Sequence, residues 1–426
     1  MNDLLIENAS ILDVKSGKVL EGSNIYISNG TITGINVNKD CPQKINLNDN
    51  LVIPGLINAH THAAMTLLRS YADDLALIDW LTNHIWPKEA QIINPETVYI
   101  GTLIACYEMA KNGITTFVDM YFYEDFVAKA AEEIGLRALI GEGVLSVPTP
   151  HAKGETQGIE NTKKLIEKYK GSDLISPIVA PHAPYTCSDE LLRELTQIAI
   201  RENCPLHIHL SESEKEFFDI QKEKNLTPTG YLEKLGVFEA KTFAAHVNYL
   251  TDNDITILKD YNVSVVHCPE SNAKLASGIC PVAKLIQSGV NVALGTDGAA
   301  SNNNLDILGE MDFALKLQKI SSKNPQTLKA LDALQMATSK GAASIFKNDI
   351  GSIEVGKWAD FLVIDRENPS MLPGHHPVSD LVYSATPDCI LSVCVNGKWI
   401  IKNKEEQFDK EKIIKLTKEV LKRYFP

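Results

Sequence analysis

Alternating apolar and polar residues mark both ends of the chain. From Leu4 to about Asn50 the sequence reads LLIENASILDV and SGKVLEGSNIYISNGTITGINV, and after about residue 350 the same texture returns in GSIEVGKWADFLVID and ILSVCVNGKWIIKN. A period of two with frequent turn residues is typical of hairpin strands. We therefore expect strands from both ends to form one small β-sandwich domain, comprising residues 1–53 and 351–405.

The middle of the chain, residues 54–350, alternates apolar runs with helical patterns. A helical stretch such as SDELLRELTQIAIREN, with Ser188 as its N-cap, has apolar residues at the spacing of one helix face. Eight strand–helix units of this kind predict an α/β protein with a (β/α)₈ TIM barrel. The strand-like runs lie at residues 51–60, 114–120, 136–145, 174–181, 204–210, 242–246, 262–268 and 291–297.

A doubly wound open sheet is the alternative architecture for this alternation. It would most naturally carry a G-x-G-x-x-G turn after its first strand, and no such turn follows residues 51–60. The pattern therefore favours the barrel. Beyond it, FDKEKIIKLTKEVLKRYF predicts a C-terminal helix within residues 406–426.

Composition and charge narrow the class of protein. Hydrophobic residues make up 44% of the chain and charged residues 22%, which is typical of a globular protein. The net charge of −13, without a basic cluster, disfavours nucleic acids and anionic membranes as partners. The N-terminal MNDLLIENAS has no basic stretch before its apolar run, and nowhere do 18 apolar residues follow one another, so we expect a cytoplasmic protein.

Polar residues gather at the C-terminal ends of the predicted barrel strands, the face on which TIM-barrel enzymes carry their active sites. Most of the eleven histidines belong to this group. In strand order, the residues are His60 and His62, then His182, then His207, His209 and Glu212, then His246, His267 and finally Asp297.

His60 and His62 are two residues apart on one strand, so both side chains point to the same face and can reach one ion. By itself an H-x-H pair at the start of a loop requires no metal. With His209 and Asp297 at the ends of two other strands, however, three imidazoles and a carboxylate make a fitting ligand set for zinc or iron(II). His207 is the other candidate on the fifth strand, but it is expected one layer lower as a buried, hydrogen-bonded residue.

Proton transfer requires further groups beside such a site. Water bound to a zinc ion ionises near pH 7 and supplies a hydroxide nucleophile. Glu212 follows His209 by three residues, where a carboxylate that is not a ligand could protonate the group under attack. His246 ends the sixth strand and Asp297 the eighth, so they flank the same place, where they could orient and deprotonate the water.

Taken together, five motifs resemble the amidohydrolase superfamily over nearly the whole chain: PGLINAHTH, HIHLSE, AAHVNYLTDNDI, VVHCPESNAKLASGICPV and LGTDGAASNNNLDILGEM. Within it, WPKEA, APHAPYTCS and HLSE are similar to the 5′-methylthioadenosine/S-adenosylhomocysteine deaminases and the related 5′-deoxyadenosine deaminases. The resemblance implies one divalent ion, Zn²⁺ before Fe²⁺ or Mn²⁺. The ligands that it implies are His60, His62, His209 and Asp297.

The resemblance also implies roles for other residues. Glu212 becomes the proton shuttle to a purine ring nitrogen, His246 acts on the activated water, and Glu89 and His182 contact a small nucleoside substrate, together with Glu212 and Asp297. The implied reaction is attack of hydroxide at C6 of an adenine ring with loss of ammonia. We also expect a homo-oligomer.

Two other classes of protein stay open at this point. Single-metal deaminases or hydrolases of guanine, cytosine-like rings or chlorotriazines have similar ligand sets, and a scaffold could keep the fold without catalysis. A binuclear amidohydrolase is disfavoured because the fourth strand ends in VAPHAPY, without the bridging lysine.

One position departs from the family pattern. Members commonly place an arginine after the third strand to hold the substrate tail, where this chain reads GEGVLSVPTPH with Glu142. A carboxylate there would disfavour the carboxylate of homocysteine, so methylthioadenosine and 5′-deoxyadenosine become better candidates than S-adenosylhomocysteine. His151 or Lys153 in the following loop could compensate.

Overall fold

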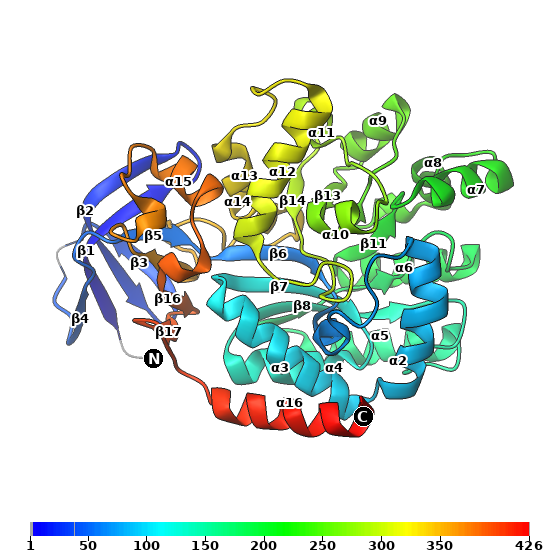
Figure 1. Cartoon of the computed structure of the whole chain (residues 1–426), viewed down its shortest axis with the longest axis horizontal. Coiled ribbons are helices and arrows are strands. Elements are labelled where there is room, and N and C mark those ends of the chain that lie inside the picture. Colours follow the sequence, from blue (N-terminus) through cyan, green and yellow to red (C-terminus); the bar gives the residue numbers. More distant parts are fainter. Residues whose placement is uncertain (1–2, 38, 426) are drawn as a thin grey trace.

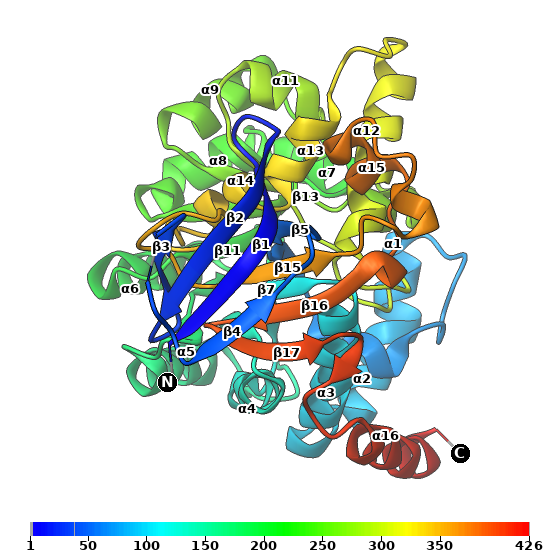
Figure 2. The same cartoon turned by 90° about the vertical axis from the view of Figure 1, so that its left-hand side faces the viewer.

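Strands from both ends of the chain form one nine-stranded sheet (Figures 1 and 2). The computed structural model describes residues 3–37 and 39–425. β5 pairs with β1 on one side and with β15 on the other, and so joins the two ends of the chain. The strands are β1 (Leu4–Asp13), β2 (Lys18–Ser28), β3 (Thr31–Ile35), β4 (Gln43–Asn46), β5 (Leu51–Pro54), β15 (Phe361–Ile364), β16 (Ile390–Val395), β17 (Lys398–Lys402) and β18 (Glu405–Glu406). This sheet fits the predicted small β domain, whose limits at residues 53, 351 and 405 stay a prediction.

The remaining strands are parallel and form two sheets that meet edge to edge. Val179 bridges to Leu206 at one seam, and at the other the Asp297 N–H donates to the His60 carbonyl at 3.0 Å. With both seams hydrogen-bonded, the predicted barrel is closed. Its strands are β6 (Leu56–Thr61), β7 (Ile114–Tyr121), β8 (Arg137–Val144), β9 (Ile175–Pro177) with β10 (Ala180–Pro181), β11 (Leu206–Leu210), β12 (Thr242–His246), β13 (Ser264–His267) and β14 (Val292–Leu294).

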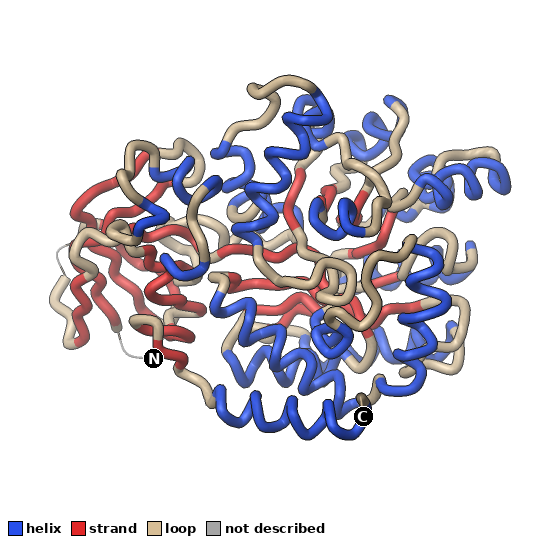
Figure 3. Tube along the Cα trace, in the orientation of Figure 1, coloured by secondary structure: helices blue, strands red, loops and turns tan. Residues whose placement is uncertain are grey.

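Helices surround the barrel strands on the outside (Figure 3). In α6, Ser188 is the N-cap as predicted, and its hydroxyl accepts the Leu191 N–H at 3.1 Å. The helices between and after the strands are α1 (Leu77–Asp79), α2 (Trp86–Ile92), α3 (Pro95–Lys111), α4 (Glu124–Ile134), α5 (Glu155–Tyr169), α6 (Asp189–Glu202), α7 (Glu214–Lys224), α8 (Pro228–Leu235), α9 (Asp252–Asp260), α10 (Pro269–Lys274), α11 (Val282–Gln287), α12 (Ile307–Ser322), α13 (Ala330–Met336), α14 (Ser339–Ser344), α15 (Pro377–Tyr383) and α16 (Lys410–Tyr424).

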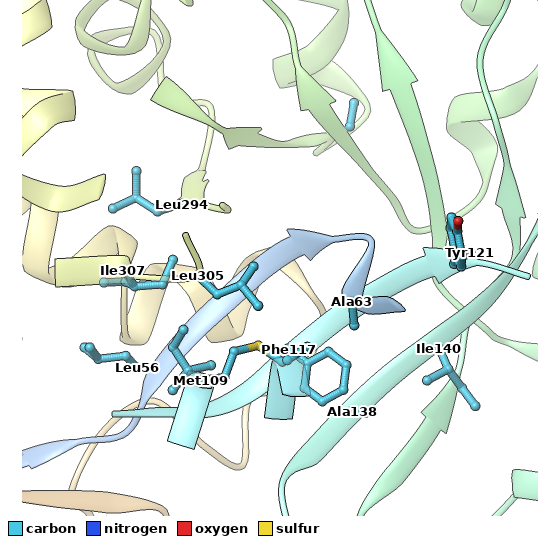
Figure 4. Packing of buried hydrophobic residues seen from close by; sticks show 14 of the residues in the cluster. Leu56, Ala63, Met109, Phe117, Tyr121, Ala138, Ile140, Leu294, Leu305 and Ile307 are labelled. Atoms are coloured by element: carbon cyan, nitrogen blue, oxygen red, sulfur yellow. The ribbon is translucent and has the colours of Figure 1, made fainter. Parts of the chain in front are cut away.

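The main hydrophobic core lies between these helices and the barrel strands. Figure 4 shows Leu56 of β6, Phe117 of β7 and Ala138 of β8 in this core, with Met109 contributed by α3 and Ile307 by α12. All five are fully buried, so burial of one apolar helix face against the strands fixes the positions of the strand ends. In the described part of the chain, no helix combines the length and apolar character needed to cross a bilayer.

Two predicted elements have different limits in the structure. The run at residues 51–60 is not one strand: it divides at Gly55, so that β5 belongs to the nine-stranded sheet and β6 to the barrel. A Cβ at Gly55 would lie only 2.0 Å from the Thr115 hydroxyl, so the crossing requires glycine. The C-terminal helix begins at Lys410 rather than 406 because Glu405–Glu406 pairs with β17. Pro426, its predicted end, lies outside the described residues.

A buried ion pair connects the barrel to the nine-stranded sheet. Arg137 of β8 places Nε 2.9 Å from Asp360 Oδ2 and Nη2 3.2 Å from Oδ1, and both side chains are buried. Asp360 Oδ1 also accepts the Asn396 N–H at 2.7 Å. The two parts of the chain are therefore joined by a bidentate contact without access to water.

Candidate metal centre and active-site pocket

The C-terminal ends of the barrel strands bring the predicted metal ligands together. Asp297 Oδ1 lies 3.3 Å from His62 Nε2 and 3.5 Å from His60 Nε2. The Nε2 atoms of His62 and His209 are 3.4 Å apart. His60, His62 and Asp297 offer ligand atoms within 4.8 Å of one another, and so do His60, His209 and His246. These residues lie in β6 or directly after it, in β11, in β12 and in the loop after β14, as predicted from the order of the strands.

The Nδ1 atoms of His62 and His209 point away from the centre, and their contacts show that Nδ1 carries a proton in each ring. His62 Nδ1 lies 2.6 Å from the Met120 carbonyl oxygen, and His209 Nδ1 lies 2.7 Å from that of His182. Because a carbonyl oxygen only accepts, each Nδ1 must donate a proton. In the neutral ring, Nε2 then keeps its lone pair and faces the centre, which is the form that binds a metal.

His60 obtains the same orientation from a second histidine. His207 Nδ1 lies 3.0 Å from the Phe243 carbonyl oxygen and donates to it, so His207 Nε2 is an acceptor. That nitrogen lies 2.7 Å from His60 Nδ1, which must donate. His60 Nε2 is then left buried without a hydrogen-bond partner, and a metal ion would satisfy its lone pair. Burial lowers the pKa of His60 to about 4, which keeps the ring neutral.

Asp297 is held by hydroxyl and amide donors. Ser271 and Ser301 donate to Oδ2 at 2.6 and 2.8 Å, and the Gly298 N–H donates to Oδ1 at 2.7 Å. Burial alone would raise the pKa of Asp297, but the imidazoles of His60 and His62 hold it well below its usual range. Its backbone φ of 61° is rare for a non-glycine residue, and strain of this kind concentrates at functional sites.

His246 and Glu212 face each other across the centre, with His246 Nε2 4.0 Å from Glu212 Oε2. Burial opposes protonation of His246, but the Glu212 and Asp297 carboxylates raise its pKa. Burial raises the pKa of Glu212 in turn. Both groups therefore hold a proton more readily than they would in water.

Two asparagines that sequence reasoning missed hold His246 and Glu212 in place. His246 Nδ1 donates to Asn272 Oδ1 at 2.9 Å, Asn272 Nδ2 donates to Asn248 Oδ1 at 2.9 Å, and Asn248 Nδ2 donates to the Glu212 carbonyl oxygen at 2.8 Å. Each asparagine accepts one hydrogen bond with its side-chain oxygen and donates one with its side-chain nitrogen, so the positions of these two atoms are determined. The only signal was their position just beyond the sixth and seventh strand ends.

Glu216 is a second residue that sequence reasoning missed. Its carboxylate, in the first turn of α7, accepts the N–H groups of Ser211 and Glu212 at 2.9 and 2.8 Å. Ser211 has a φ of 49°, so this strained turn depends on Glu216 to satisfy its amides. Burial raises the pKa of Glu216 to about 7. The sequence SESEKE at residues 211–216 is typical of an exposed segment, so it did not indicate that Glu216 accepts these two amide hydrogen bonds.

Glu89 and His182 lie on the walls of the pocket above the centre. Glu89 of α2 is buried and accepts a hydrogen bond from the Tyr121 hydroxyl, and burial raises its pKa to about 7. His182 Nδ1 lies 2.9 Å from the Thr186 hydroxyl oxygen, and burial lowers the pKa of His182 to about 3. The wall therefore offers one carboxyl group and one neutral imidazole.

Aromatic and aliphatic side chains form the rest of the pocket. Trp80 and Trp86 both line it. Phe122, Leu145 and Tyr185 complete the wall. This pocket, with aromatic and aliphatic side chains on most of its wall and polar groups at its base and on one side, suits a flat aromatic ring such as a nucleobase.

Comparisons with known proteins agree with this arrangement. The amidohydrolase family model matches residues 51–400. A 5-methylthioadenosine/S-adenosylhomocysteine deaminase from Thermodesulfovibrio yellowstonii is 47% identical over 365 residues, 85% of this chain and 83% of the relative. A 5′-deoxyadenosine deaminase from Methanothermobacter thermautotrophicus is 41% identical over 418 residues, 96% of each chain. An adenosine deaminase from Xanthomonas campestris, solved with bound zinc, has a TM-score of 0.96 at 37% identity, covering 99% of this chain and 98% of that one.

Proposed function

Because the chain belongs to the amidohydrolase family, we propose that it catalyses hydrolytic deamination of an adenosine derivative at a single divalent-metal site. The products are the corresponding inosine derivative and ammonia. The candidate substrates are 5′-methylthioadenosine, S-adenosylhomocysteine, 5′-deoxyadenosine and adenosine. The observation that carries the proposal is the convergence of four ligand side chains with Glu212 and His246 beside them.

The proposed ligands are His60, His62, His209 and Asp297. Their donor set, three imidazoles and one carboxylate, suits Zn²⁺, with Fe²⁺ and Mn²⁺ as alternatives. The zinc in the Xanthomonas campestris adenosine deaminase supports the choice of zinc. When bound, such an ion acidifies water and so makes a hydroxide nucleophile available near neutral pH.

The proton transfers are assigned to Glu212, His246 and Asp297. Glu212, whose raised pKa lets it hold a proton, delivers that proton to the purine nitrogen next to C6 as the nucleophile attacks. His246 directs Nε2 toward the same space and orients the attacking water, while Asp297 accepts a proton from it. The proton held by Asp297 then passes to the 6-amino group, Glu212 recovers its proton from the new C6 hydroxyl, and the C6–N bond breaks to release ammonia.

Glu89 and His182 are the proposed contacts to the sugar. A carboxylate accepts two hydrogen bonds from neighbouring hydroxyl groups, so Glu89 suits the 2′- and 3′-hydroxyls of a ribose. The neutral His182 ring adds a donor or acceptor beside it. Neither contact would serve a free base such as guanine. A cytoplasmic homo-oligomer without a nucleic-acid partner stays the expectation from the sequence.

The test is ammonia release across a substrate panel. We expect the zinc-loaded protein to release ammonia from at least one of the four adenosine derivatives, and much less from guanine, cytosine or a chlorotriazine. Release from one of these three but from no adenosine derivative would replace the proposal with the alternative reaction. No release from any compound would favour a non-catalytic scaffold.

A further inference from the structure

A second cavity opens beside the active-site pocket and shares one wall with it. Trp86, Glu89, Phe122, Leu145 and Tyr185 line both cavities. The outer cavity has a volume of about 810 Å³ and continues along the loop at residues 146–150. A ligand in the pocket can therefore extend past Glu89 into this space.

The outer cavity is apolar and carries no positive charge. Val147, Tyr185 and Trp86 expose 55, 40 and 38% of their surface around it, although large apolar side chains are normally covered. Among residues 3–37 and 39–425, no lysine or arginine lines either cavity. The surface thus suits an uncharged ligand and offers no cationic partner for a carboxylate.

Glu142 does not face this space, contrary to the expectation from the sequence. Its carboxylate lies 2.7 Å from His151 Nδ1, and the His151 ring stacks on Tyr123 with centroids 4.1 Å apart. Neither Glu142 nor His151 nor Lys153 lines either cavity. Any selection at the substrate tail therefore comes from the apolar wall and not from repulsion by Glu142.

We propose that the outer cavity binds the 5′ substituent of the adenosine derivative and selects uncharged thioethers, from methylthio to longer alkylthio groups, over the zwitterionic homocysteine tail. This inference rests on the proposed function. Glu89, the proposed ribose contact, stands where the two cavities meet, which directs the 5′ carbon outward. A carboxylate there would lose water without gaining a cation. Each buried methylene, in contrast, favours binding about fourfold.

The first test compares kcat/KM for 5′-methylthioadenosine, 5′-butylthio-5′-deoxyadenosine and S-adenosylhomocysteine, with adenosine as the reference. We expect the butylthio compound to equal or exceed the methylthio compound, and S-adenosylhomocysteine to fall at least about tenfold below both. Equal rates for S-adenosylhomocysteine and methylthioadenosine, or a large loss with the butylthio group, would overturn the inference while deamination itself stands. Failure to deaminate any adenosine derivative would instead refute the proposed function.

A charge introduced into the wall provides the second test. Val147→Arg, at a half-exposed position, should raise kcat/KM for S-adenosylhomocysteine relative to methylthioadenosine by at least about fivefold. Val147→Gln is the matched control for side-chain length without charge, and Glu142→Gln tests the buried carboxylate. Val147→Gln should change the ratio much less than Val147→Arg does, and Glu142→Gln should leave it unchanged. A ratio that responds to Glu142→Gln but not to Val147→Arg would contradict the assignment of the cavity.

Discussion

His60 donates a hydrogen bond from Nδ1 to His207 Nε2 at 2.7 Å, entirely inside the barrel. His207 is in turn fixed by its own donation to the Phe243 carbonyl oxygen. This pair determines which nitrogen of His60 faces the centre. The second H-x-H motif of the chain therefore contains one proposed ligand, His209, and one residue that orients a different ligand.

Replacing His207 should weaken metal binding without removing a ligand. In His207→Phe the acceptor for His60 Nδ1 is lost, and we expect metal affinity to fall about 10- to 100-fold. His207→Gln, which keeps an acceptor oxygen, should retain more of the affinity. Titration with a competing chelator measures both, and thermal unfolding separates this effect from loss of the fold. Unchanged affinity in His207→Phe would show that the pair is only packing.

Glu216 should act on turnover through the turn that carries Glu212. Glu216→Gln keeps one acceptor oxygen and leaves one of the two amides poorly satisfied, so kcat should fall about tenfold while the metal content stays the same. The metal content of the purified variant and its kcat are measured side by side. An unchanged kcat would mean that Glu216 does not position Glu212.

Glu89 should make the free energy of unfolding depend on pH between the pKa of its carboxyl group in the unfolded chain and the higher pKa in the folded protein. Burial raises its pKa from 4.5 to about 7, so across this range the folded state holds a proton that the unfolded state has lost. The contribution of Glu89 to stability is full below pH 4.5 and is lost as the pH rises to 7, by about 3 kcal/mol. Glu89→Gln cannot lose this contribution, so denaturant titrations should show the variant gaining stability over the native chain as pH rises. Parallel pH profiles would exclude a raised pKa.

The Arg137–Asp360 pair should matter for stability rather than catalysis. Arg137→Met leaves Asp360 buried without its cation, and we expect the free energy of unfolding to fall by about 3–5 kcal/mol. Lys15→Met, which removes an exposed ion pair with Glu354, is the control and should cost less than about 1 kcal/mol. If chemical denaturation gave equally small losses in the free energy of unfolding for Arg137→Met and Lys15→Met, the buried pair would not hold the sheet to the barrel.

The sequence could predict the barrel and the proposed ligands because both follow from local patterns. Apolar runs locate the strands, and a polar residue at a strand's C-terminal end must face the same mouth as its neighbours. His60, His62, His209 and Asp297 are all of this kind. The division of residues 51–60 between two sheets was not visible, because it depends on the close approach of Thr115 to Gly55.

The supporting contacts could not be predicted, because their partners come from distant parts of the chain. Asn248 and Asn272 acquire a role only when β12 and β13 lie side by side, and Glu216 only when α7 folds back onto the Glu212 turn. The orientation of Glu142 likewise depends on where His151 lies. Such side chains look like ordinary polar residues until the tertiary structure sets their neighbours.

The central claim is that His209 binds the metal whereas Glu212 transfers a proton. It is tested most directly by measuring metal content and turnover on the same variants. Ammonia release from 5′-methylthioadenosine and metal content are determined together for the native chain, Glu212→Gln and His209→Ala. We predict that His209→Ala loses both, whereas Glu212→Gln keeps its metal and loses at least about 100-fold in turnover. A Glu212→Gln protein that releases ammonia at the native rate would contradict the account.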